Sequence, residues 1–414
     1  MSGVRTRIAA VAMLALATSA LAQESQTLRD RDPDLSGSKR IANQLQEANF
    51  HYGSLYLLSR LRISDAGYSE DFYLPTGTQG GGFSIGVEAP NRLYFLPNKK
   101  VVLSAEFTPG YSFFRANGSR RQFNYLARGD AHFLLNHLYL DVYSQRADQL
   151  RAHVADFNSL ATVREDETGV AGEFKYSSRT SALFALRGRN TRYPGNRFQP
   201  DPLLVQVTEL DRNERNARVS VMHKTFPLTS LFVAAERSDY DFRTVENKNS
   251  SRTYAGGGFE FARGRTSLRV EAGPMRLDFD DAAKHDYSGL TAEVQAQRVN
   301  GRWRYYAGGN RDLGFSLFTD NDYYIANTAA AGVDYAATRR LTLVGNTAFE
   351  RDTYDTPVGG VRRKDTASFT SVGFRYAISR FRVGLDGGWY EHKSTLLTDD
   401  DSGIRYVLHL SFTP

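Results

Sequence analysis

The sequence has no cysteine and only 2 tryptophans among its 414 residues. Without cysteine the chain can form neither a disulfide bond nor a metal site held by thiolates. Beyond residue 22 it also lacks the roughly 20 consecutive apolar residues that a membrane-spanning helix needs, and its mean hydropathy is −0.46. These absences leave two classes open for an exported chain, namely a soluble protein and a β-barrel, because only helices and closed barrels span membranes.

The amino-terminal residues predict a secretory signal peptide over residues 1–22. Arg5 and Arg7 supply the positive region, Ile8 to Ala17 the apolar region, and Ala20 to Ala22 a small-x-small cleavage site before Gln23. An uncleaved membrane anchor is the alternative, but the apolar run is short for a spanning helix.

Residues 23–50 are predicted to form a periplasmic amino-terminal segment that is partly disordered. The run from Arg29 to Asp34 is too polar to fold by itself. Ile41 and Leu45 share one helical stripe, so a short helix is expected there, and a plug or docking helix is the alternative.

From residue 51 onward, apolar and polar side chains alternate in segments of about ten residues, the length of a tilted membrane strand. The last segment shows the pattern clearly, because Tyr406 and Leu408 fall on one face and Arg405 and His409 on the other. The 23 tyrosines and 26 phenylalanines also favour strands and the aromatic girdles of membrane barrels. The predicted strands lie at 55–63, 83–89, 103–108, 123–133, 138–143, 170–176, 182–189, 217–222, 231–237, 253–261, 268–272, 290–297, 303–310, 329–335, 341–350, 372–376, 381–390 and 404–412.

Two of these strands leave a local question open. The segment 231–237 fits either assignment of its two faces, and Gly273-Pro274 predicts a β-bulge, because proline cannot serve a central ladder.

The connections between the predicted strands alternate between tight turns and long polar stretches. Tight turns are expected near residues 136, 179, 264, 301, 339 and 379, and long loops at 65–80, 147–167, 190–215, 241–251, 278–286, 311–322, 351–365 and 391–402. A membrane barrel has this asymmetry, whereas an immunoglobulin-like sandwich or a propeller does not require it. The sequence therefore predicts an all-β, antiparallel up-and-down barrel of about 18 strands (16–18) in the outer membrane of a Gram-negative cell, with both termini periplasmic.

The face opposite the apolar one carries charges of both signs, and we expect it to line the lumen. These charges either pair across neighbouring strands or together guide polar solutes. The candidate lumen residues are Arg128, Asp130, Arg187, Arg189, Arg218, Glu260, Arg269, Glu271, Glu293, Arg304, Arg375, Arg382, Asp386 and Arg405. The candidate assembly signal at the carboxyl end is Tyr406, Leu408, Leu410 and Phe412.

Nothing in the sequence predicts catalysis, a metal or a cofactor. The 8 histidines are scattered, none adjoins a serine in a nucleophile elbow, and no pair has metal-ligand spacing. The formal net charge of +6 falls to +4 when Arg5 and Arg7 are removed, with both signs interspersed, so no nucleic-acid partner is expected.

Several segments resemble one known family, the putative beta-barrel porin 2 family. They are Leu210 to Glu214, Ala217 to Val221, Leu231 to Arg237, Asp239 to Asp241, Asp286 to Leu290 and Arg339 to Leu343. Ser64 to Tyr68 matches only in part the Asp- and Asn-rich element that often follows the first strand of the family, so no subfamily is assigned.

The resemblance implies an outer-membrane component of exopolysaccharide export. A diffusion porin for small polar solutes and a structural or adhesion barrel with a filled lumen are the alternatives. The partners expected with this reading are outer-membrane lipid and lipopolysaccharide, the barrel assembly machinery, periplasmic polysaccharide export proteins, and polysaccharide or small polar solutes.

Overall fold

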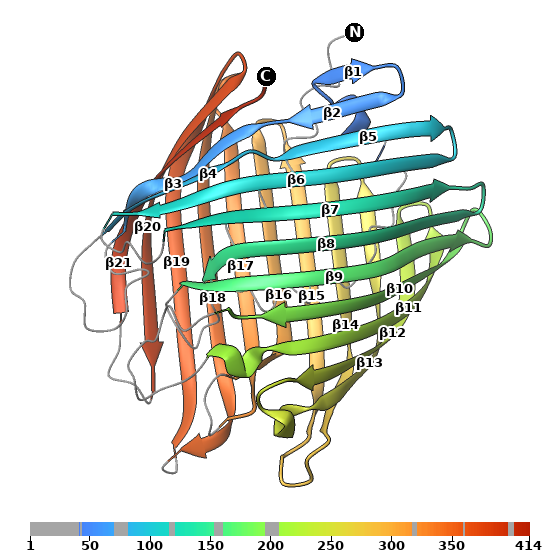
Figure 1. The fold of residues 1–414 in the computed structure, drawn as a ribbon, viewed down its shortest axis with the longest axis vertical. Coiled ribbons are helices and arrows are strands. Elements are labelled where there is room, and N and C mark those ends of the chain that lie inside the picture. The colour runs from blue at the N-terminus through green and yellow to red at the C-terminus, as the bar shows by residue number, and fades with distance from the viewer. Residues whose placement is uncertain are drawn as a thin grey trace.

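The chain folds into one closed antiparallel β-barrel (Figure 1). This computed structural model describes residues 41, 44–69, 82–115, 121–152, 160–194, 207–316, 321–358, 361–395 and 401–414. Within these residues, no helix is long and apolar enough to cross a membrane. The strands are β1 (Phe50–Tyr52), β2 (Leu55–Ser59), β3 (Leu61–Ser69), β4 (Gly82–Glu88), β5 (Asn91–Asn98), β6 (Val101–Phe114), β7 (Gln122–Leu134), β8 (Leu138–Ala152), β9 (Leu160–Lys175), β10 (Thr180–Arg192), β11 (Arg212–Phe226), β12 (Thr229–Phe242), β13 (Ser250–Arg263), β14 (Thr266–Phe279), β15 (Tyr287–Asn300), β16 (Trp303–Phe315), β17 (Tyr323–Ala336), β18 (Leu341–Val358), β19 (Val361–Ile378), β20 (Phe381–Ser394) and β21 (Asp401–Phe412).

The predicted barrel of eighteen strands is confirmed. Arg60 divides the first strand of the wall into β2 and β3, and Ala89-Pro90 divides the second into β4 and β5, while β1 only folds back onto β2. β21 pairs with β3, for example Phe412 with Leu61, and this pairing closes the wall. Figure 1 shows the red strands β20 and β21 beside the blue strands β3 and β4.

Short turns gather at one end of the barrel, which we call the short-turn end; the other is the long-loop end. The turns after β13 and β15 use Gly264 and Gly301 at φ +57°, a backbone conformation that favours glycine. Asn49 and the carboxyl-terminal Pro414 lie together at the short-turn end, because Asn49 Nδ2 donates a hydrogen bond to the carbonyl oxygen of Pro414 at 3.3 Å.

The strands extend well beyond the lengths that the alternation predicts. Residues 147–152 and 160–167, predicted as loop, belong to β8 and β9, and residues 351–358 and 361–365 belong to β18 and β19. The loop prediction was wrong there. Polar side chains on the outer face do not end a strand as long as its backbone continues to form hydrogen bonds with the neighbouring strand.

The predicted bulge at Gly273-Pro274 was also wrong. β14 pairs with β15 without a shift, Gly273 opposite Thr291 and Pro274 opposite Leu290. On the other side, the ladder with β13 keeps its register across the interruption. A Cβ on Gly273 would lie 2.4 Å from the Cα of Gly256. Two facing glycines therefore let the backbones approach closely, and the register survives the missing N–H of the proline.

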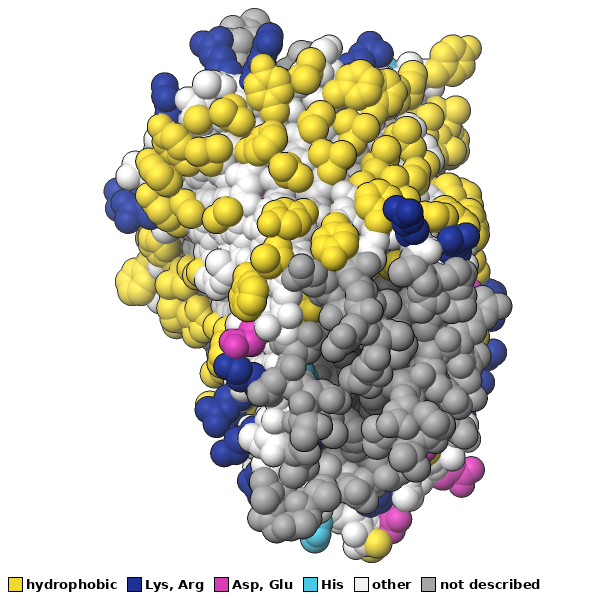
Figure 2. Space-filling view, turned by 90° about the vertical axis from the view of Figure 1, so that its left-hand side faces the viewer, with side chains coloured by type: hydrophobic (Ala, Val, Ile, Leu, Met, Phe, Trp, Pro, Cys, Tyr) yellow, Lys and Arg dark blue, Asp and Glu magenta, His cyan; other side chains and the backbone are white. Residues whose placement is uncertain are grey.

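The outer face of the wall is apolar over much of its height, and Figure 2 shows hydrophobic side chains spread over one side of it. β12 settles the open question about its faces, because Leu231 and Val233 are exposed on the outside. Further along the same strand the exposed residues are Arg237 and Asp239, and the buried ones change from Glu236 to Tyr240 and Phe242. The polarity of the two faces therefore inverts toward the long-loop end, as expected where the outer face leaves lipid and meets water.

Candidate functional site

The interior face of the wall carries a row of polar side chains in which arginine and glutamate alternate over most of its length. Each member stands directly opposite the next in the strand register, and the Arg/Glu neighbours are opposite-charge pairs of the kind that stabilise sheets. The row runs through Arg92, Glu106, Arg128, Gln145, Glu167, Arg189, Glu214 and Tyr240, on β5 to β12.

Three arginines of this wall, Arg128, Arg187 and Arg189, are engaged by carboxylates. Arg189 Nε donates to Glu167 Oε2 at 2.7 Å, and Arg187 donates to Glu214 at 3.2 Å. Arg128 Nε donates to Asp130 Oδ1 at 2.6 Å. Arg187 and Arg189 are almost fully covered. These candidate lumen residues therefore form a neutralised wall and do not present a free positive surface.

Arg218 is the centre of the most buried charge network. The residue is 3% exposed, and its guanidinium lies 3.1 Å from Glu236 and 2.7 Å from Glu271. Tyr254 donates its hydroxyl to Glu271 at 2.8 Å, and Arg269 reaches the same carboxylate at 3.3 Å. Arg218 thus joins β11, β12 and β14. The network brings together three of the candidate lumen residues, Arg218, Glu271 and Arg269.

Four tyrosines of the interior repeat one arrangement, with an arginine over the ring and the hydroxyl donating to an acceptor. We call these the Arg–Tyr units. The guanidinium carbon lies 4.3 to 5.8 Å from the ring centroid in the pairs Arg128/Tyr143, Arg218/Tyr254, Arg304/Tyr306 and Arg363/Tyr354. The acceptors are Glu167, Glu271, Asn346 and Asp365, respectively. Each ring is therefore held in place from both sides.

The remaining predicted residues lie on β13, β15, β16 and β19 to β21. Arg375 binds Asp386 with two hydrogen bonds of 2.6 and 2.5 Å, and His409 Nε2 lies 2.8 Å from the same carboxylate. Arg304 pairs with Asp334, Glu260 lies 3.7 Å from Arg269, and Glu293 accepts a hydrogen bond from Gln295 at 2.7 Å. Arg405 stands opposite Gly388 and Ser69 in the register.

Arg382 differs from the other arginines of the set. Arg382 is exposed. In the strand register, Ser411 of β21 stands between Arg382 of β20 and Arg62 of β3. No carboxylate within the described ranges forms an ion pair with Arg382. An anion in the lumen would therefore meet positive charge at this end.

A cluster that the sequence did not reveal lies on β6, β7 and β8. His132 Nδ1 lies 2.8 Å from Asp141 Oδ1, and Ser104 donates to Asp130 at 2.9 Å. Donor atoms of Asp130, His132 and Asp141 lie within 4.8 Å of one another, an arrangement that could hold a metal ion. Because Arg128 already binds Asp130 at 2.6 Å, we interpret the cluster as a hydrogen-bonded polar network. Only the strand register brings these residues together, so sequence spacing could not show it.

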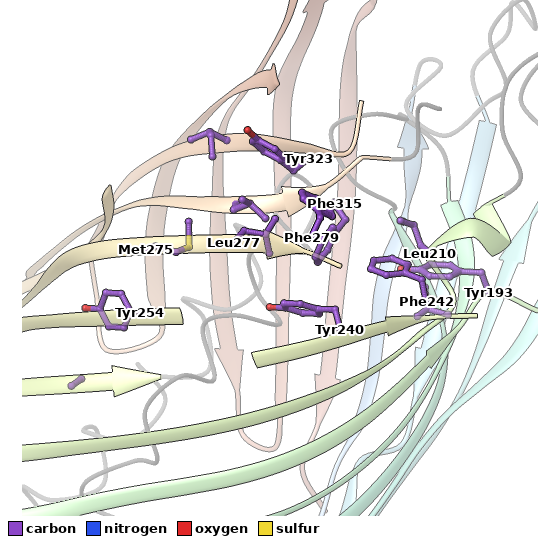
Figure 3. Close-up of a cluster of buried hydrophobic side chains, with 14 residues drawn as sticks. Tyr193, Leu210, Tyr240, Phe242, Tyr254, Met275, Leu277, Phe279, Phe315 and Tyr323 are labelled. Atoms are coloured by element: carbon purple, nitrogen blue, oxygen red, sulfur yellow. The ribbon is translucent and has the colours of Figure 1, made fainter. Parts of the chain in front are cut away.

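An aromatic cluster fills part of the interior toward the long-loop end (Figure 3). Phe315 packs edge-on against Tyr240 and Phe242, with ring centroids 4.8 and 5.0 Å away. At the edge of the cluster, Asp211 accepts a hydrogen bond from the backbone N–H of Tyr193 at 2.7 Å, and burial raises the pKa of its carboxyl. Several members lie in stretches predicted from the sequence to be polar loops, because their outward neighbours are charged.

Comparisons with known proteins agree with this architecture. The sequence profile described as putative beta-barrel porin 2 matches residues 145–396. Among curated proteins, no sequence matches the chain. Among solved structures, Pseudomonas aeruginosa OpdK with vanillate is similar at a TM-score of 0.51 and 12% identity, covering 86% of this chain and 98% of that one. Pseudomonas aeruginosa OccK3 (OpdO) is similar at a TM-score of 0.50 and 12% identity, covering 86% of this chain and 95% of that one.

A bacterial polysaccharide outer membrane secretin is similar at a TM-score of 0.39 and 10% identity, covering 86% of this chain and 98% of that one. At 12% identity, the OpdK and OccK3 structures show the fold alone.

Proposed function

We propose, from the premise that this chain belongs to the putative beta-barrel porin 2 family, that its porin-like barrel is the outer-membrane pore of an exopolysaccharide export system. The short-turn end with both termini then faces the periplasm, and residues 1–22 are the cleaved signal peptide. The proposed role is conduction, which requires no catalytic group in the wall.

The observation that supports this role is the set of Arg–Tyr units on the interior wall. A sugar ring has an apolar face that packs on an aromatic ring, and hydroxyl groups that bond to charged neighbours. Tyr143 and Tyr306 keep part of their surface accessible, whereas Tyr254 and Tyr354 are buried within the wall. The two accessible rings beside paired charges offer both contacts without a strong net charge, so a long sugar chain can bind weakly and still move. The ion pairs Arg128 with Asp130 and Arg363 with Asp365, at 2.6 and 2.5 Å, keep that wall rigid.

Deleting the gene tests the direction and class of cargo. We expect surface polysaccharide to be lost and small-nutrient uptake to stay unchanged, because the exported chain comes from the periplasm. Surface polysaccharide should return when the intact gene is supplied. A diffusion porin gives the opposite result, with normal surface polymer and slower uptake, and that outcome would reject the export role.

Charge at the short-turn end should set the ion preference of the pore. Arg187, Arg189 and Arg304 are covered and paired with carboxylates. Arg382 is exposed, and Arg62 is partly exposed with Glu88 at 3.7 Å, so these two arginines are the better targets. Replacing both, Arg62→Gln with Arg382→Gln, should shift selectivity toward cations and weaken block by acidic oligosaccharides several-fold in planar bilayers. The effect should shrink at high salt, since the Debye length falls from about 10 Å at 0.1 M to about 3 Å at 1 M.

The matched control for this double variant is Arg237→Gln with Arg276→Gln, which removes the same charge from exposed positions on the outer face. It should leave selectivity unchanged. Equal shifts in both double variants would show that overall charge, and not the position of Arg62 and Arg382, determines the preference.

A further inference from the structure

Ile41 and residues 44–49, which we call the mouth segment, lie against the interior wall at the short-turn end. Ile41 is 2% exposed and packs with Tyr94, which is 0% exposed, and with Val102. Leu45 of the same segment packs on this cluster together with Tyr56 and other wall residues. The apolar stripe predicted from Ile41 and Leu45 therefore faces the wall of β2, β5 and β6.

Polar side chains of the mouth segment also bind the wall. Tyr94 donates its hydroxyl to Gln44 Oε1 at 2.7 Å, and Arg60 donates to Glu47 Oε2 at 2.9 Å. Asn49 donates to the carbonyl oxygen of Ser59 at 2.9 Å. Because these three side chains all reach the barrel, the segment is seated by specific contacts.

The wall beneath the mouth segment combines three kinds of group. Arg60 is a cation that binds a carboxylate, Tyr94 offers a hydroxyl donor, and Tyr56 adds a second ring opposite Tyr94 in the register. Across the seam, Arg382 adds positive charge on one side of Ser411, and Arg62, which lies 3.7 Å from Glu88, stands on the other side. A cation, a hydroxyl donor and aromatic rings are the groups that would recognise an acidic sugar, through its carboxylate, an oxygen acceptor and the apolar face of its ring.

We propose that the mouth segment occupies a binding site for acidic sugar units of the exported polymer, with the Glu47 carboxylate and the Gln44 carbonyl in the places of the sugar carboxylate and oxygen. The proposal rests on the export function above and names its substrate class. A polymer of acidic units displaces the segment because many linked units compete with one carboxylate, which raises their effective concentration at the site.

Single cysteines measure the displacement, since the natural chain has none. In proteoliposomes, Ile41→Cys should react slowly with a membrane-impermeant thiol reagent. Oligomers of galacturonic acid should speed this labelling at least tenfold, and neutral maltose oligomers of equal length should not. The matched control is Gln46→Cys, at an exposed position of the same segment, which should label fast under all conditions.

The variant Arg60→Gln separates binding from a general effect of charge. In the Ile41→Cys background it should raise the labelling rate without sugar, because the bond to Glu47 is lost, and it should abolish the further acceleration by galacturonate oligomers. Heat-modifiable migration on gels would verify that each variant is folded.

Fast labelling of folded Ile41→Cys without sugar would overturn the seated segment. Equal acceleration by neutral and acidic oligomers, or no acceleration by either, would overturn the acidic-sugar site. These outcomes are independent of the gene deletion, which tests export itself, so failure of one proposal can be told from failure of the other.

Discussion

Replacing Arg218 by methionine should destabilise the barrel by about 3 to 5 kcal/mol, the usual cost of removing one partner from a buried ion pair. Methionine keeps the length of the side chain but leaves the carboxylates of Glu236 and Glu271 in a buried site without their central cation. Urea unfolding of the protein in lipid vesicles, followed by tryptophan fluorescence, would measure the loss.

Two companion variants make the Arg218 experiment decisive. Arg237→Met removes an exposed arginine paired with exposed Asp239, and should cost no more than about 1 kcal/mol. Adding Glu236→Gln and Glu271→Gln to Arg218→Met should recover much of the stability, because the stranded charges are then gone. If Arg218→Met is as stable as Arg237→Met, the network does not hold the wall together.

A charge on the outer face of the closing strand should prevent assembly. Leu410 stands opposite Ile63 and Val383, and Phe412 opposite Leu61 and Phe381, with the two phenylalanine rings 4.8 Å apart. The double change Leu410→Asp with Phe412→Asp places two charges against lipid, at a cost of up to about 3 kcal/mol each, depending on depth. It also weakens the pairing that closes the barrel, so heat-modifiable protein should be missing from outer-membrane fractions.

Ser411→Asp is the matched control, because it introduces the same side chain between Leu410 and Phe412 on the opposite face. There the new carboxylate stands between Arg62 and Arg382, so it should be tolerated. Failure of Ser411→Asp, or normal assembly of the double variant, would show that lipid exposure of this face does not control closure.

The sequence by itself determined the wall of this protein. Alternation with period two is a local property, because successive side chains of a strand point to opposite sides whatever the strand pairs with. The eighteen strands and the outward direction of Leu103 and Leu385 could therefore be predicted without coordinates. The face of 231–237 could not be predicted, because both sides carry apolar residues and each side ends in a charge, Glu236 on one and Arg237 on the other.

Only the tertiary structure decided what the interior residues contact. Arg218 reaches Glu271 across 53 positions of sequence, and Tyr94 reaches Gln44 across 50. Such pairs depend on strand register, stagger and closure, and on the return of an amino-terminal segment into the mouth, none of which leaves a local pattern. The sequence also did not predict that, near the long-loop end, charged residues lie outside and aromatic residues lie inside. A residue's preferred side depends on whether lipid or water lies outside, and that is set by its height on the assembled barrel.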